Sequence, residues 1–131
     1  MTTTIENTTE YTQAQIAHRK ACAFLKGVIC GYNEYRGHPY HTTKPRTPEF
    51  DKGFEIGLNK LNGGDFISAK SITAIHIIHN RLRHRRPHIG ETYDANQSDW
   101  TAKRLIEKHL GEGTFELAME QAQKDREVTN G

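Results

Sequence analysis

Two pairs of glycines, each pair spaced four residues apart, constrain the fold of this chain more than any other feature. Gly53 and Gly57 lie in a segment whose apolar residues recur at i, i+3, i+4 and i+7, the spacing of one helical face. A glycine inside a helix costs about 1 kcal/mol relative to alanine, so two on one face indicate that another backbone approaches closely. Gly27 and Gly31 repeat the spacing in the preceding segment. We therefore predict two helices packed through their glycines, with the alternative that Gly31 is only a C-cap.

Residues around these glycines predict where the two helices begin and end. Thr47 is a favoured N-cap and Pro48 a favoured first helical residue, so the second helix is predicted to begin there and to extend to Leu61. The first helix is predicted to run from Thr12 to about Arg36, because a glycine and a proline follow closely.

The rest of the chain predicts three further helices and no strand. Their predicted ranges are 72–86, which Pro87 ends, 98–110, with Ser98 as N-cap, and 114–128. We therefore predict an all-α, single compact domain of about five helices over residues 12–131, preceded by a flexible tail of residues 1–11. In this domain the two glycine-rich helices are expected to form an antiparallel hairpin, with the helix over 72–86 packed across it.

Charge is distributed unevenly along the chain, although the formal net charge is only +2. Residues 36–88 contain ten Lys or Arg and four acids, whereas the rest of the chain contains eight Lys or Arg and twelve acids. Such segregation predicts that the central surface binds an anionic partner, with nucleic acid as the leading candidate. The alternative is that the acidic ends fold back onto the basic middle.

The strongest functional signal is a run of four arginines within residues 81–86, at the end of the helix predicted over 72–86. Arginine suits bidentate contact with phosphate and stacking on bases. The alternative is a solvated helix end, since cations near a helix C-terminus are favoured by the helix dipole. The predicted phosphate contacts are Arg81, Arg83, Arg85 and Arg86, assisted by Lys44 and Arg46 from the loop. His79 and His88 are also predicted to bind nucleic acid, and the predicted base-stacking residue is Tyr32 or Tyr40.

No catalytic or metal-binding motif is found in the sequence. There is no phosphate-binding glycine loop, nucleophile elbow or metalloprotease helix. The chain has eight histidines, several of them in or near the helix predicted over 72–86. No carboxylate lies between Asp65 and Glu91, so the charge of a divalent cation bound by these histidines would not be balanced there. We therefore predict no catalytic residue, metal or cofactor, and interpret these histidines as part of a basic face on the helix over 72–86. The alternative is a histidine-dependent nuclease.

The cysteines and the hydropathy favour a cytoplasmic protein. Cys22 and Cys30 are eight residues apart on a predicted helix, a rise of roughly 12 Å that prevents a disulfide between them. They are predicted to be buried thiols in a reducing compartment. No apolar run approaches the ~18 residues of a membrane span, so no membrane partner is expected.

Residues 27–61 resemble ribosome modulation factor, a family of small basic bacterial proteins. The matching features are Gly31-Tyr32 on the first helix, Pro39-Tyr40 with Thr42 and Arg46 in the loop, and Phe50 with Gly53-Phe54 at the start of the second helix. Members of that family bind the small ribosomal subunit near the 3′ end of its RNA and silence translation, so the resemblance implies a related RNA or ribosome contact. Phenylalanines replace the family's tryptophans, and residues 62–131 have no counterpart. We therefore expect a larger, phage-encoded protein that carries this hairpin.

These patterns together predict a non-enzymatic RNA-binding or ribosome-associated regulator of translation. The alternative is a small protein-interaction module or inhibitor that uses its basic patch against an acidic protein or DNA. Both hypotheses predict binding that weakens as salt is added.

Overall fold

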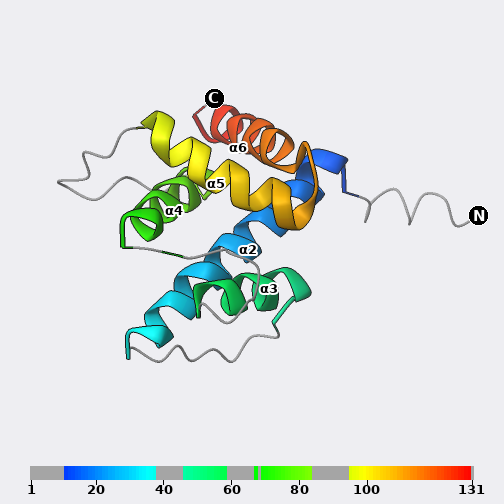
Figure 1. Cartoon of the computed structure of the whole chain (residues 1–131). Coiled ribbons are helices and arrows are strands. Elements are labelled where there is room, and N and C mark those ends of the chain that lie inside the picture. The colour runs from blue at the N-terminus through cyan, green and yellow to red at the C-terminus, as the bar shows by residue number, and fades with distance from the viewer. Residues whose placement is uncertain (1–10, 38–45, 59–66, 68, 84–94, 131) are drawn as a thin grey trace, which may run out of the picture.

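The computed structural model of the chain describes residues 11–37, 46–58, 67, 69–83 and 95–130. Within these residues the chain forms five helices and no strand, which confirms the predicted all-α fold (Figure 1). The helices are α2 (Gln13–Tyr35), α3 (Pro48–Gly57), α4 (Ala69–Leu82), α5 (Ala95–Leu110) and α6 (Thr114–Asn130). The predicted tail lies outside the described residues except for Tyr11.

Side-chain caps begin α2 and α3 where the sequence predicts. The hydroxyl of Thr12 accepts a hydrogen bond from the backbone N–H of Gln15 at 3.1 Å, and the Gln15 side chain accepts one from the Thr12 N–H at 2.8 Å. This reciprocal pair is a capping box. At α3 the hydroxyl of Thr47 accepts from the N–H of Phe50 at 3.1 Å, with Pro48 as the first helical residue. Both predicted N-termini are therefore confirmed.

Other predicted boundaries are wrong: α3 ends at Gly57 rather than Leu61, and α4 begins at Ala69 rather than at residue 72. α4 ends at Leu82 rather than continuing to Arg86, and the Leu82 carbonyl accepts a hydrogen bond at 2.8 Å from Nε2 of His18 on α2. In a continuing helix that carbonyl would instead accept from the N–H of residue 86. α5 begins at Ala95, so Ser98 lies inside the helix and does not cap it. Ala95 and Gln97 are compatible with helix, which allows the earlier start.

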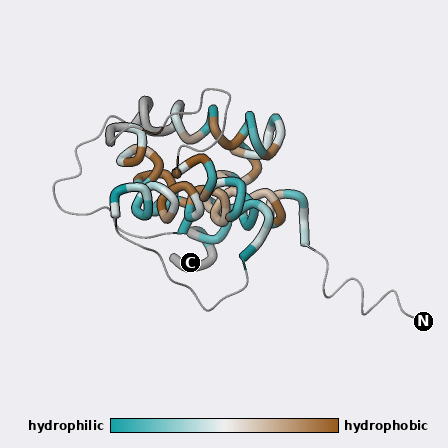
Figure 2. The backbone as a smooth tube through the Cα atoms, turned by 60° about the horizontal axis from the view of Figure 1, so that its bottom comes forward, coloured by the Kyte–Doolittle hydropathy of each residue, from teal (hydrophilic) through white to brown (hydrophobic). Residues whose placement is uncertain are grey.

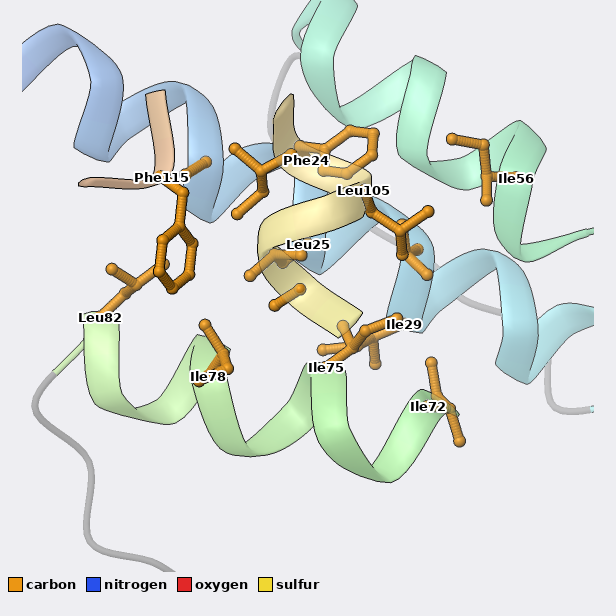
Figure 3. Packing of buried hydrophobic residues seen from close by; sticks show 14 of the residues in the cluster. Phe24, Leu25, Ile29, Ile56, Ile72, Ile75, Ile78, Leu82, Leu105 and Phe115 are labelled. Carbon is orange, nitrogen blue, oxygen red and sulfur yellow. The ribbon is translucent and has the colours of Figure 1, made fainter. Parts of the chain in front are cut away.

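A core of apolar side chains forms where α2 meets α4, α5 and α6. Figure 2 shows the hydrophobic stretches gathered on the sides where the helices face one another. In Figure 3 the side chains of Ile72, Ile75, Ile78 and Leu82 project from one side of α4 toward α2 and α5. The other core residues labelled there are Phe24, Leu25, Ile29, Ile56, Leu105 and Phe115.

α4 is buried on more sides than the sequence predicts. The apolar stripe predicted from helical spacing comprises Ile72, Ala74, Ile75, Ile78 and Leu82. Ile77 and His79 lie outside it, yet they are only 9% and 3% exposed. The reason is that α4 packs against both α2 and α5, so that two of its faces are covered. His79 is therefore not part of an exposed basic face, and its predicted role in contacting nucleic acid is corrected here.

The glycine faces of α2 and α3 meet backbone to backbone. A Cβ atom placed on Gly27 would overlap the carbonyl oxygen of Phe50, and one placed on Gly53 would overlap the carbonyl oxygen of Phe24. These obstructing atoms belong to the main chain, which cannot move aside as a flexible side chain can. The structure therefore has the close approach that the glycine spacing predicts.

The direction of this helix pair differs from the prediction, because α2 and α3 run parallel. One turn beyond the first contacts, a Cβ on Gly31 would overlap the carbonyl oxygen of Phe54, and one on Gly57 would overlap that of Val28. Residue numbers thus rise together along both helices. The chain over residues 37–46 can span about 30 Å when extended, which is roughly twice the length of a ten-residue helix such as α3. It is therefore long enough for α3 to begin further back along α2 and run in the same direction.

Candidate nucleic-acid interface

The structure describes half of the predicted contact residues and distributes them over three helices. Arg81 lies in the last turn of α4 and Arg83 directly follows that helix, while Arg46 precedes α3. His79 and Tyr32 are described as well. The predicted residues that lie outside the described ranges are Lys44, Tyr40, Arg85, Arg86 and His88.

Arg83 occupies the end of α4, beside α2. Its backbone N–H donates to the carbonyls of His79 and Asn80 at 3.1 and 3.2 Å, which closes the helix, while its side chain is exposed. The preceding carbonyl, that of Leu82, accepts from Nε2 of His18. Because a carbonyl oxygen only accepts, His18 carries a proton on Nε2 in this arrangement. No pattern in the sequence singles out His18, which lies 64 residues from its partner.

Cys22 lies in the same corner as Arg83. Its Sγ is 3.8 Å from Nε2 and 4.0 Å from Nδ1 of His18. Burial raises the pKa of the Cys22 thiol from its ordinary value of 9.0 to about 11, and the nearby positive charge of Arg83 opposes that rise only in part. The thiol is therefore neutral at pH 7, which disfavours a role as nucleophile because the thiolate is the reactive form.

Neither helix that meets at Arg83 contributes an acid to this corner. α2 has no Asp or Glu before Glu34, and the stretch from Ala69 to Arg83 has none. The stretch of α2 before Glu34 does contain basic residues, Arg19 among them. The other acids in the described parts of the chain lie on α3, on α5, on α6 or in the turn between α5 and α6. We call Arg81, Arg83 and the adjoining His18 the basic corner; the stretches of α2 and α4 that form it carry basic residues and contain no Asp or Glu.

Arg46 makes its contacts on α3 instead. Its Nε donates to Oδ1 of Asp51 at 2.7 Å, and its guanidinium lies 4.9 and 4.6 Å from the ring centroids of Phe50 and Phe54. These two rings stack on each other and, with Cys30, form a small second cluster. Arg46 thus covers this cluster, and a phosphate would have to compete with Asp51 for its guanidinium.

Tyr32 does not have the exposed ring that base stacking requires. It is 8% exposed and belongs to the main core, with the Arg36 guanidinium 5.8 Å from its ring centroid. Its neighbour Tyr35 is 60% exposed. The sequence contained the signal for this difference, because Tyr32 falls on the apolar stripe of its helix. The prediction of Tyr32 as a stacking residue is therefore corrected, whereas Tyr40 lies outside the described residues.

Neither a metal-binding cluster nor a membrane-spanning helix occurs in the described ranges. Those ranges contain no group of three or more His, Cys, Asp or Glu side chains arranged to hold a metal ion. Among the same residues, no helix combines the length and the apolar character needed to cross a membrane. Comparison of the chain with protein-family models, with curated proteins and with solved structures found no match.

Proposed function

We propose that this protein is a non-enzymatic RNA-binding protein that regulates translation through contact with the ribosome. The observation that carries the proposal is the basic corner, where the exposed Arg83 ends α4 beside two helical stretches without acids. An exposed guanidinium in such a field attracts phosphate and can bind it in a bidentate way. In the sequence, Arg83 is followed within three residues by Arg85 and Arg86, which add charge to the same run.

The ribosome enters the proposal through the resemblance of residues 27–61 to ribosome modulation factor. Two helices joined by a proline-containing connection are present in this chain, with the matching Gly31-Tyr32 and Gly53-Phe54 steps at their contact. The resemblance supports the small ribosomal subunit as the RNA-containing partner. The two glycine-aromatic steps serve helix packing here, so the phosphate contacts are assigned to the basic corner.

Binding of a single-stranded RNA oligonucleotide across a salt series tests this proposal. Replacing Arg83 with alanine should weaken binding and reduce the slope of log affinity against log salt by roughly 0.7, the value for one lost phosphate contact. Lys103→Ala is the matched control, since it removes one exposed cation from α5 and changes the net charge equally. We expect Lys103→Ala to retain the wild-type slope.

The outcomes separate RNA binding from the alternative functions. Equal affinity and slope for Arg83→Ala and wild type would contradict the proposal, as would binding to an acidic protein without binding to RNA. Cosedimentation with purified small ribosomal subunits should occur with wild type and diminish with Arg83→Ala. Binding to free RNA without any cosedimentation would retain the RNA-binding part and exclude the ribosome.

A further inference from the structure

A shallow, open pocket adjoins the basic corner. It has a volume of about 180 Å³ and lies between the beginning of α2 and the second half of α6. Its lining residues are Tyr11, Gln15, His18, Arg19, Gln121 and Asp125. His18 belongs to both sites, because its Nε2 donates to the carbonyl of Leu82, the residue before Arg83. The pocket therefore adjoins the end of α4, where Arg83 lies.

Two planar groups form one part of the lining. The guanidinium carbon of Arg19 lies 4.6 Å from the centroid of the Tyr11 ring, and Tyr11 is 52% exposed. Tyrosine rings and arginine planes are the surfaces on which unpaired bases stack in single-stranded RNA complexes. The volume is below the roughly 300 Å³ at which pockets for drug-sized ligands begin, so a single ring system fits better than a larger molecule.

Polar side chains complete the lining with groups suited to the edge of a base. Gln121 donates from Nε2 to Oδ1 of Asp125 at 2.8 Å, which positions the carboxylate. A carboxylate can accept about four hydrogen bonds, so the bond from Gln121 does not exhaust the acceptor positions of Asp125. Its negative charge disfavours a phosphate in the pocket and favours a ligand that donates N–H groups. Among the four RNA bases, guanine presents two adjacent donors, N1–H and N2–H, on its Watson–Crick edge.

We propose that this pocket binds one unpaired guanine of an RNA strand whose backbone lies against Arg83. The assignment rests on the RNA-binding function proposed above and adds a base preference to it. Tyr11 and Arg19 supply the stacking surface, and Asp125 accepts from the donor edge of the base. The phosphate on the same strand is bound outside the pocket, where α2 and α4 contribute no acids.

The test compares RNA oligonucleotides of nine uridines with oligonucleotides in which the central uridine is replaced by guanosine, adenosine or cytidine. Wild type should bind the guanosine oligonucleotide at least about fivefold more tightly than the all-uridine one, the lower limit for a good bidentate base contact. Asp125→Asn should remove this preference, so that the guanosine oligonucleotide and nine uridines bind this variant with equal affinity. Equal affinity of wild type for all four oligonucleotides would overturn the proposal.

Tyr11 variants test the stacking contact separately. Tyr11→Ala should weaken binding of the guanosine oligonucleotide by about 5-fold to 150-fold without changing the salt slope, whereas Tyr11→Phe should bind like wild type. Tyr35→Ala is the matched control, since it removes an exposed tyrosine from the C-terminal end of α2, whereas Tyr11 precedes the N-terminal end. Wild-type affinity in Tyr11→Ala, or an equal loss in Tyr35→Ala, would contradict the assignment to this pocket.

The same experiments distinguish failure of the pocket from failure of the RNA-binding proposal. If Arg83→Ala reduces the salt slope while the Asp125 and Tyr11 variants bind like wild type, RNA binding stands and the guanine pocket is excluded. If wild type binds none of the oligonucleotides, both proposals are wrong. Circular dichroism of each variant, compared with wild type, establishes that the fold is retained.

Discussion

α2 packs against its neighbours in two different ways. Against α3 it presents Gly27 and Gly31, and the two backbones touch with no side chain between them. Against α4, α5 and α6 it presents larger apolar residues such as Phe24 and Leu25, which interlock with side chains from those helices (Figure 3). One helix thus combines a contact that depends on the absence of side chains with a core that depends on their volume.

The difference predicts opposite sensitivities to substitution. In the side-chain core, removing methyl groups leaves a cavity, whereas a swap of similar volume can be accommodated by small shifts. At the glycine contact, nothing can be removed, and adding even one methyl group forces two backbones apart. The following predictions test this contrast, in order of decreasing effect.

Removal of volume from the side-chain core should have the largest effect. Ile78 of α4 is fully buried in the main core, so Ile78→Ala should lower the free energy of unfolding by about 2 to 5 kcal/mol through lost burial and a residual cavity. Ile78→Leu keeps the volume and should cost less than about 1.5 kcal/mol. Urea denaturation measures both. Equal losses for the two variants would show that this core depends on shape as strictly as the glycine contact does.

Addition of volume at the glycine contact should come next. In Gly53→Ala the new Cβ would overlap the Phe24 carbonyl and lie 2.9 Å from the backbone nitrogen of Val28. We expect a net loss of about 1 to 3 kcal/mol, despite alanine's advantage of about 1 kcal/mol in helix propensity. Glu55→Ala, an exposed position on the same helix, is the control and should change stability by less than about 0.5 kcal/mol. A more stable Gly53→Ala protein would refute the backbone contact.

Loss of an N-cap should act locally on α3. Thr47→Ala removes the hydroxyl that accepts from the Phe50 N–H and should cost about 1 kcal/mol. Because Cys30 is 2% exposed and packs against Phe50, opening of α3 should expose its thiol. We expect Cys30 labelling to become about fivefold faster, as 1 kcal/mol implies. Thr12→Ala, which removes the corresponding cap on α2, should leave Cys30 labelling unchanged if α3 opens independently.

At pH 7 the Cys22 thiol should have the smallest effect of all, because its titration influences stability only at high pH. The folded thiol has a pKa of about 11 and the unfolded thiol one near 9.0, so both are protonated at pH 7 and the group does not affect stability there. As the pH rises from 9 to 11, the unfolded thiol ionises first, and stability must fall. The difference in unfolding free energy between wild type and Cys22→Ala should change over this range. A difference that is constant from pH 7 to 11 would contradict the raised pKa.

Much of the fold could be predicted from the sequence because it depends on contacts between residues close in the chain. The Thr12 and Thr47 caps act within three residues of the helix start, and the apolar stripes follow the helical period. The cost of glycine within a helix predicts a close backbone contact at Gly27 and Gly53. These local rules determined the number and type of the helices and the faces by which α2 and α3 pack.

The tertiary structure decided what depends on residues far apart in the chain. The end of α4 coincides with a hydrogen bond from His18 to Leu82, and no local rule predicts that pairing. His79 is buried because α4 has neighbours on two sides, which its own periodicity does not reveal. The parallel direction of α2 and α3 also lies beyond the sequence pattern, since glycines spaced four apart present the same small face in either direction. Periodicity identifies the face of a helix, whereas its neighbours and direction depend on how the whole chain packs.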